Sequence, residues 1–331
     1  MKKTWKQITA LTLAFIALLF TAGCGSNDDD KLNVRIAYFP NITHTQALIL
    51  KNQGKLEEAW KDACNVSWTS FNAGPAEIEA IFAGEIDLGY IGPVPAINAN
   101  FKSSGDVKII SNATNAGAVL LARKGSGISS AKDLAGKKVA VPQIGNTQHL
   151  CLLSLLSENG LKPVDKGGDV TISASSNADI LNLMDNGSVD AAVVPEPWGA
   201  TIEKNGNAEV VLDYDELFLE GNYPTAVVIA NGDFMEKHPE YVKDFLAMHE
   251  EATLFINEHA KEAQEIVNSE IKGVTGKSID TDILESAFSR MTADTTLHTN
   301  AIMTFANISK EEGFISSVPE ERNVFNTEFN Q

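Results

Sequence analysis

Two short polar turns carry the side chains best suited to binding a solute. Each turn, at residues 40–46 and 142–149, follows an apolar segment typical of a β-strand and precedes one typical of a helix. A helix N-terminus offers backbone N–H groups without intrahelical partners and about half a positive charge. Such turns can therefore bind an anion. The candidate contacts are Asn41, Thr43, His44, Gly145, Asn146 and Thr147.

The same side chains also have ordinary structural roles. Thr43 and Thr147 are typical helix caps, and a histidine in a first helical turn is more often a cap or a packed side chain than a ligand contact. Asn146 and Thr147 are the stronger candidates, because Gly145 permits close backbone approach. A favourable neighbour can keep such a histidine charged near neutral pH. His149, farther into its helix, is the weaker of the two histidines.

No arginine lies in either turn, so an anion bound there must be held by neutral donors. The sequence has four arginines, which are Arg35, Arg123, Arg290 and Arg322. The formal net charge of the chain is −18, which argues against nucleic acid as a partner.

An internal repeat relates these turns to two further segments. The repeated pattern is found at residues 76–97 and 178–202. It consists of a helix with an apolar face, a glycine, a short strand that follows Asp87 in one copy and Asp190 in the other, and a P-x-P turn into another helix. Matching positions are 102 or 103 residues apart, and the polar turns are offset by 102 to 104. Two matches in one order predict two similar α/β lobes. Because ligands bind beyond the carboxyl ends of such strands, we expect a shared cleft.

Further candidate contacts lie in the segments NAGPAE, LGYIGPVP and PEPW. A proline at a helix start commonly has a structural role alone. A buried tryptophan is at least as often part of the hydrophobic core as part of a ligand-binding wall. Glu196 would repel a simple anion but could pair with the ammonium group of a zwitterion such as taurine; alternatively it faces solvent or caps the next helix. These candidates are Asn72, Gly74, Pro75, Tyr90, Gly92, Pro93, Glu196 and Trp198.

The order of segments predicts a discontinuous first lobe. We expect lobe 1 to contain residues 33–122 and 223–331, and lobe 2 to contain residues 123–222. The apolar segments 117–124 and 225–235 are candidates for the two crossings between lobes. The amphipathic helices after Pro239 are expected to pack on lobe 1.

The first residues resemble an export signal. Residues 1–23 have a cationic start and an apolar run too short to span a bilayer comfortably. The following TAGC resembles a bacterial lipobox, with Thr21 in place of the commoner leucine. This predicts lipidation at Cys24 and a polar tether over residues 24–32. A simple secretory signal is the alternative. Cys64 and Cys151 fall in different halves of the repeat, so we expect two packed free thiols.

The sequence contains no convincing catalytic constellation. GVTGKS at 273–278 mimics the end of a phosphate-binding loop, but Ile271 stands where its first glycine belongs. The H-E-x-x-H, paired C-x-x-C and G-x-S-x-G motifs are absent. We therefore expect neither an enzyme nor a metal or cofactor site.

Three segments carry a resemblance to a known family. The chain resembles solute-binding proteins of bacterial ABC importers for aliphatic sulfonates, taurine, nitrate and thiamine-related pyrimidines. The resemblance is carried by the segments FNAGPAEIEAIFAGEIDLGYIGPVPAI, KDLAGKKVAVPQIGNTQHLCLLSLLSENGLK and LMDNGSVDAAVVPEPW. The likeness is greatest to the sulfonate branch. It implies an α/β periplasmic-binding-protein type II fold, with a mixed, mostly parallel sheet in each lobe, and a cleft lined by the loop at 72–75.

The resemblance also implies a role and partners. The protein would be a monomer, held on the extracytoplasmic face of the cell membrane by its lipid, and would deliver a small organic anion to an ABC permease and its ATPase. The alternatives are a receptor for a thiamine-type pyrimidine or other heteroaromatic, a sensory or adhesion lipoprotein, and an enzyme of the same fold.

Overall fold

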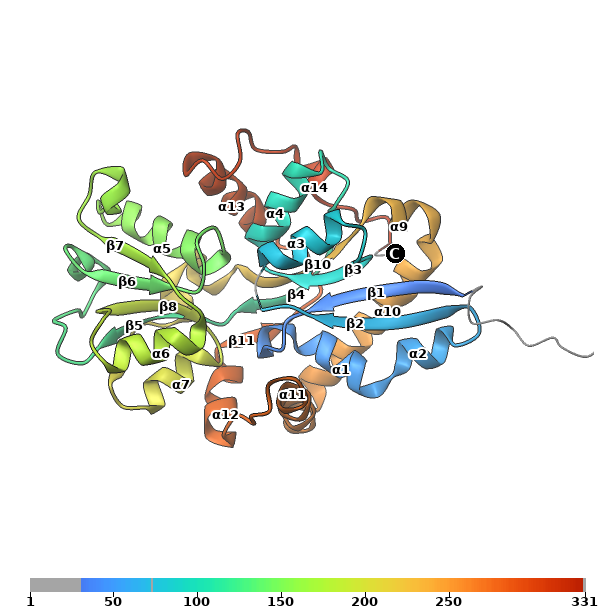
Figure 1. The fold of residues 1–331 in the computed structure, drawn as a ribbon, viewed down its shortest axis with the longest axis horizontal. Coiled ribbons are helices and arrows are strands. Elements are labelled where there is room, and N and C mark those ends of the chain that lie inside the picture. Colours follow the sequence, from blue (N-terminus) through green and yellow to red (C-terminus); the bar gives the residue numbers. More distant parts are fainter. Residues whose placement is uncertain (1–30, 73, 330–331) are drawn as a thin grey trace, which may run out of the picture.

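Two β-sheets, each covered by helices on both faces, form the two lobes of the protein in a computed structural model (Figure 1). The structure describes residues 31–72 and 74–329. The expected signal segment and Cys24 lie outside these residues. Within the described part, no helix is both long and apolar enough to cross a membrane.

The first sheet has six strands in the order β11-β4-β10-β3-β1-β2. Strands β1, β2 and β3 run parallel, while β10 runs antiparallel to both β3 and β4, and β11 antiparallel to β4. The central strands are apolar and buried on both faces, as expected for a sheet between two helical layers. The strands are β1 (Leu32–Tyr38), β2 (Cys64–Ser70), β3 (Leu88–Ile91), β4 (Lys108–Ala116), β10 (Pro224–Ala230) and β11 (Met291–Ala293).

The second sheet has five strands in the order β7-β6-β8-β5-β9. Strand β6 is parallel to β7 and β8, and β5 is antiparallel to β8 and β9. Both lobes therefore contain the mixed sheets expected from the sequence. The expectation that parallel pairing predominates is not met, because antiparallel pairs outnumber parallel ones three to two in the first sheet and equal them, two to two, in the second. The strands are β5 (Ala118–Arg123), β6 (Lys138–Val141), β7 (Thr171–Ala174), β8 (Ala191–Pro195) and β9 (Ala208–Leu212).

Helices fill the connections between strands (Figure 1). Before β5 these are η2 (Ile42–His44), α1 (Thr45–Gln53), α2 (Lys55–Trp60), α3 (Gly74–Phe82) and α4 (Pro93–Lys102). Between β5 and β10 they are η3 (Ala131–Leu134), α5 (Thr147–Glu158), η4 (Val164–Lys166), α6 (Asn177–Asp185), α7 (Trp198–Lys204), α8 (Tyr214–Leu217) and η5 (Leu219–Gly221). After β10 come α9 (Gly232–Lys237), α10 (Pro239–Glu258), α11 (Ala260–Thr275), α12 (Thr281–Ser289), α13 (Thr299–Glu311) and α14 (Glu321–Val324).

The repeated aspartates have a structural role in both lobes. Asp87 accepts the backbone N–H of Arg35 at 2.9 Å, which ties the start of β3 to β1. Asp190 accepts the backbone N–H of Lys138 at 3.0 Å, which ties the start of β8 to β6. The internal repeat seen in the sequence therefore reflects one strand-pairing device used twice.

The chain passes between the sheets at Ala116–Gly117, where both residues have left-handed backbone angles, with φ of 59° and 76°. The Ala116 N–H donates to the Tyr223 carbonyl at 2.8 Å, which joins this crossing to the return crossing before β10. The sequence-based division at 122/123 is corrected here, because β5 pairs with β8 and β9 and so belongs to the second sheet.

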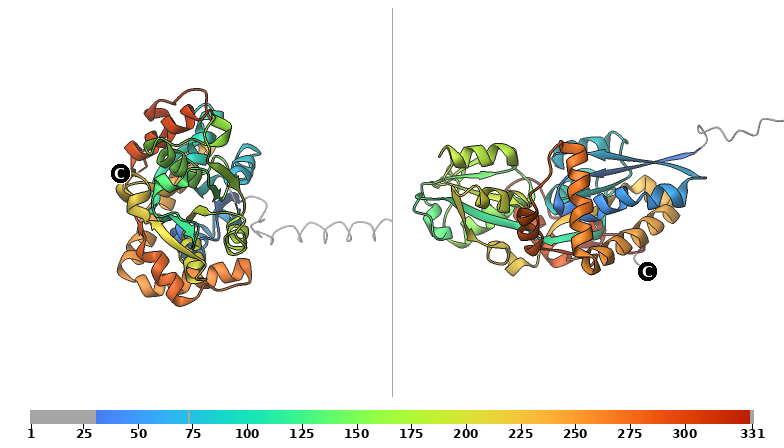
Figure 2. Two further views of the ribbon diagram at one scale, coloured as in Figure 1. Left: turned by 90° about the vertical axis from the view of Figure 1, so that its left-hand side faces the viewer. Right: turned by 90° about the horizontal axis from the view of Figure 1, so that it is seen from below.

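Helices α10 and α11 pack on α1 of the first lobe, as predicted, but α12 and α13 also contact the second lobe, which was not predicted. Helix α12 packs on α7, and α13 packs on α4 and α5. Figure 2 shows these helices beside the junction of the lobes. The amphipathic pattern predicted that each helix buries one face, but it did not specify against which lobe.

Both described cysteines are packed free thiols, as expected. Cys64 and Cys151 are buried, and neither forms a disulfide. Burial raises the pKa of both thiols, so they are poor nucleophiles.

Glu77 is an unusual member of the first-lobe core. It lies on α3 with no exposed surface, and neither carboxyl oxygen has a hydrogen-bond partner within the described chain. Burial raises the pKa of Glu77 well above its usual 4.5. The folded state therefore holds this proton to higher pH than the unfolded state does, and the free energy of unfolding falls as pH rises above about 4.5.

We expect Glu77→Leu to increase the free energy of unfolding at pH 8 by about 2 kcal/mol, because it replaces an unpaired buried polar group with an apolar one of similar size. Urea denaturation at pH 5 and pH 8 should show a larger gain at pH 8. Glu79→Leu, on the exposed face of the same helix, is the matched control. A variant less stable than the parent at pH 8 would contradict this account.

Candidate functional site

A cleft of about 520 Å³ lies between the lobes and is lined by residues of both. Its size suits a small organic molecule. The lining residues are Phe39, Pro40, Asn41, Thr43, His44, Phe71, Asn72, Gly74, Gly92, Pro95, Pro142, Gln143, Asn146, Thr147, Gln148, Ser176, Asn177, Ala178, Pro195, Trp198, Thr225 and Thr275.

Helix N-termini surround this cleft. Gly74 is the first residue of α3, Gly92 is the N-cap of α4, and Asn146 is the N-cap of α5. The 3-10 turn before α1 and the N-terminus of α6 also contribute lining residues. Since each helix start presents positive partial charge, the cleft favours a negatively charged ligand.

None of the described residues that line the cleft has a carboxylate, ammonium or guanidinium group. The lining side chains are amides, hydroxyls, one imidazole, aromatic rings, prolines and the methyl group of Ala178. An anion here would therefore be held by neutral donors, as the sequence indicated.

Several polar side chains are already used as helix caps. Asn41 accepts the N–H of Thr43 at 3.1 Å, and Asn146 accepts the N–H of His149 at 2.8 Å. By contrast, the Thr147 hydroxyl has no hydrogen-bond partner among the described residues and lies close to Gly92 of the first lobe. A Cβ placed on Gly92 would be 2.8 Å from Thr147 Oγ1. Thr147 therefore presents a free hydroxyl where the lobes approach each other.

His44 is a neutral donor rather than a cation. Its Nδ1 accepts the backbone N–H of Phe39 at 3.1 Å, and its ring stacks on the Phe39 ring with centroids 4.6 Å apart. Burial lowers the pKa of His44 to about 3. The neutral ring consequently carries its proton on Nε2, and this N–H has no partner within the described chain.

His149 repeats this arrangement in the second lobe without lining the cleft. Its Nδ1 accepts the N–H of Gly145 at 3.1 Å, and burial lowers the pKa of His149 to about 4. Each histidine therefore braces the turn that precedes its helix.

Nine of the predicted contacts line the cleft, and their contact with ligand remains a prediction. They are Asn41, Thr43, His44, Asn72, Gly74, Gly92, Asn146, Thr147 and Trp198. The other five, Pro75, Tyr90, Pro93, Gly145 and Glu196, are not among the lining residues.

For three of these five, Tyr90, Gly145 and Glu196, the structure shows what they contact instead of the cleft. Tyr90 is fully buried, and its hydroxyl lies 2.9 Å from His249 Nδ1. Gly145 packs against Phe314 rather than an open space. The two prolines occupy the first turns of α3 and α4.

Glu196 is fully buried and already paired. Its carboxylate lies 2.9 Å from Arg290 Nη1 and accepts the N–H of Ala200 at 2.9 Å. Burial raises the pKa of Glu196. The hydrogen bond from the Ala200 N–H and the positive charge and hydrogen bond of Arg290 oppose that rise. The ammonium-pairing role considered for Glu196 is therefore not supported, because the carboxylate is held behind the wall that contains Trp198.

Other residues that line the cleft were not predicted from the sequence. Phe39 and Phe71 each immediately follow a strand of the first sheet, where ligand contacts are expected. Gln143 lies in the second-lobe polar turn and Asn177 is the first residue of α6, so the repeat could have indicated them. Thr275 ends α11, far from the other lining residues in sequence, and the GVTGKS segment that contains it was considered only as an incomplete phosphate-binding loop.

Comparison with known proteins now places this two-lobed fold. The model of the NMT1-like family matches residues 27–269. The chain belongs to the NMT1-like family. The putative aliphatic sulfonates-binding protein of Bacillus subtilis is 28% identical over 280 residues, covering 81% of this NMT1-like chain and 80% of the relative. The taurine-binding periplasmic protein of Escherichia coli is 30% identical over 234 residues, which cover 70% of this chain and 66% of that relative.

Solved structures support the periplasmic-binding-protein fold for this family member. The periplasmic aliphatic sulphonate binding protein of Escherichia coli superimposes with a TM-score of 0.74 at 22% identity, over 89% of this chain and 92% of that one. A weaker sequence match, 26% identical over 191 residues, covers 54% of this chain and 53% of the 4-amino-5-hydroxymethyl-2-methylpyrimidine phosphate synthase of Schizosaccharomyces pombe. The more similar relatives are thus binding proteins.

Acid should destabilise the folded NMT1-like chain partly through His149. With a folded pKa of about 4 and an unfolded pKa near 6.5, the unfolded state binds more protons between these values, so stability is lost as pH falls below about 6.5. We expect His149→Gln to reduce the loss in unfolding free energy between pH 7 and pH 4.5 by about 2 kcal/mol. Urea denaturation measures this loss. The exposed His259→Gln variant should lose as much unfolding free energy as the parent. An equal loss between pH 7 and pH 4.5 in the parent and both variants would refute this role of His149.

Proposed function

We propose that the protein is an extracytoplasmic receptor of an ABC importer, which captures an aliphatic sulfonate by closure of its lobes and delivers it to the permease. One observation carries this proposal: helix N-termini converge on a cleft whose described lining has no ionised side chain. The names of the related proteins support the same ligand class.

The lining favours a sulfonate with an uncharged tail over an aminosulfonate. Phe39, Phe71 and Trp198 supply apolar surface for the tail. An ammonium group in the cleft would lose water without gaining a carboxylate partner, because Glu196 is engaged by Arg290. Ethanesulfonate should therefore bind more tightly than taurine.

The aromatic rings also support a second candidate ligand. A thiamine-type pyrimidine could stack on Trp198 or Phe39, and the match to a pyrimidine phosphate synthase favours considering it. Such a ligand would not need the anion-binding helix N-termini.

The cellular setting belongs to the same proposal. Residues 1–23 would direct export, lipidation of Cys24 would hold the monomer on the outer face of the cell membrane, and the permease and its ATPase would be the partners. Closure would turn about the two crossings at Ala116–Gly117 and before β10.

Calorimetric titration with ethanesulfonate, taurine, nitrate and hydroxymethylpyrimidine tests the ligand class. We expect micromolar binding of ethanesulfonate, about −8 kcal/mol, which a few hydrogen bonds and burial of the tail can supply. Binding of the pyrimidine alone would overturn the sulfonate proposal.

Thr147→Ala tests the site itself. Loss of its unpartnered hydroxyl should weaken ethanesulfonate affinity about tenfold, the value of one good hydrogen bond. Thr304→Ala, at a partly buried position of α13, is the control, since the Thr304 hydroxyl already donates to the Asn300 carbonyl. Unchanged calorimetric affinity of Thr147→Ala would remove this residue from the site.

A further inference from the structure

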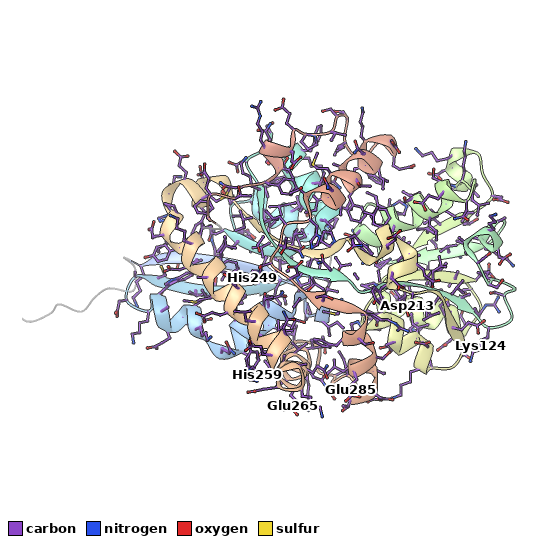
Figure 3. All side chains as sticks on the ribbon, turned by 180° about the vertical axis from the view of Figure 1, so that it is seen from behind. Lys124, Asp213, His249, His259, Glu265 and Glu285 are labelled. Atoms are coloured by element: carbon purple, nitrogen blue, oxygen red, sulfur yellow. The ribbon has the colours of Figure 1, made fainter. Side chains whose placement is uncertain are left out.

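An ion-pair cluster lies behind the part of the cleft wall that contains Trp198. Arg290 follows α12 and immediately precedes β11 of the first sheet, but its guanidinium contacts three carboxylates of the second lobe. Nη1 lies 2.9 Å from Glu196, Nη2 lies 3.1 Å from Glu203, and Nε lies 3.1 Å from Asp213. Figure 3 shows Asp213 near the junction of the two lobes.

The three carboxylates differ in their exposure to water. The side chain of Glu196 is 0% exposed, whereas those of Glu203 and Asp213 are 40% and 39% exposed. Water screens the two outer charges strongly, while a buried charge acts over a longer range. Glu196 also follows Pro195 directly and precedes Trp198 by two positions, and both of these residues line the cleft.

We propose that Arg290 determines ligand specificity by neutralising Glu196, so that the second-lobe wall does not repel an anion. This inference rests on the proposed function and assigns a residue outside the cleft to it. An unpaired Glu196 would oppose a sulfonate and attract an ammonium group, which would shift preference from simple alkanesulfonates towards zwitterions.

The central experiment is titration of Arg290→Met with ethanesulfonate and taurine at pH 8. We expect ethanesulfonate affinity to fall about tenfold, with a clearly smaller loss or a gain for taurine, from the added charge near the anion. The ratio of the two dissociation constants is the decisive readout, because a general loss of folding would weaken both ligands alike.

A pH series adds a second signature. The groups that face Glu196 are Arg290, Glu203 and Asp213, together with the Ala200 N–H. Without Arg290, the buried Glu196 carboxyl should take up a proton as the pH is lowered. The loss of ethanesulfonate affinity in Arg290→Met should therefore shrink between pH 8 and pH 5.5, while the parent affinity changes little.

Two further variants separate charge from structure. The double variant Glu196→Gln/Arg290→Met removes both charges and should restore the parent ratio at every pH. Arg123→Met is the matched control, because Arg123 pairs with Asp190 at 3.1 Å away from the cleft lining. An equal loss for both ligands in Arg290→Met, or no recovery in the double variant, would overturn the inference. Failure of the parent protein to bind any sulfonate would instead overturn the proposed function.

Discussion

The starts of several helices line one gap between the lobes, and the described lining of that gap contains no fixed charge. A charged side chain would hold an anion tightly, but it would also carry its own counterion and solvent into the site. Partial charges on rigid helices need no side-chain ordering when the ligand arrives. The sheets hold these helices in place, and the repeated aspartate tie keeps β3 and β8 in register with β1 and β6. The framework of both lobes thus holds in place the helix starts that line the cleft.

This electrostatic arrangement works only if nearby charges are cancelled or kept neutral. His44 and His149 remain uncharged because burial lowers the pKa of each ring, and each uses Nδ1 to brace a turn. Glu196 is buried beside the wall, where Arg290 compensates its charge. The protein can therefore carry a strongly negative overall charge, formally −18, while its cleft favours an anion.

Much of this architecture could be predicted from the sequence, because the repeat preserves both spacing and residue type. The two sheets, the shared cleft and the polar turns at Asn41 and Asn146 follow from strand–turn–helix patterns that recur at nearly constant separation. These patterns did not predict whether an individual side chain faces the cleft or the core. Tyr90 lies next to the end of β3, where a wall residue was expected, yet its hydroxyl contacts His249 from α10, more than 150 residues away. Long-range partners such as this, and Arg290 for Glu196, leave no local pattern.

The straddling position of the C-terminal segment has a mechanical consequence. Two crossings alone would allow the lobes to swing widely, but α12, α13 and Arg290 add a third connection between them. A third connection narrows the range of orientations that the empty protein samples. If the lobes close on a solute as proposed, this third connection would reduce the orientational entropy lost on closure.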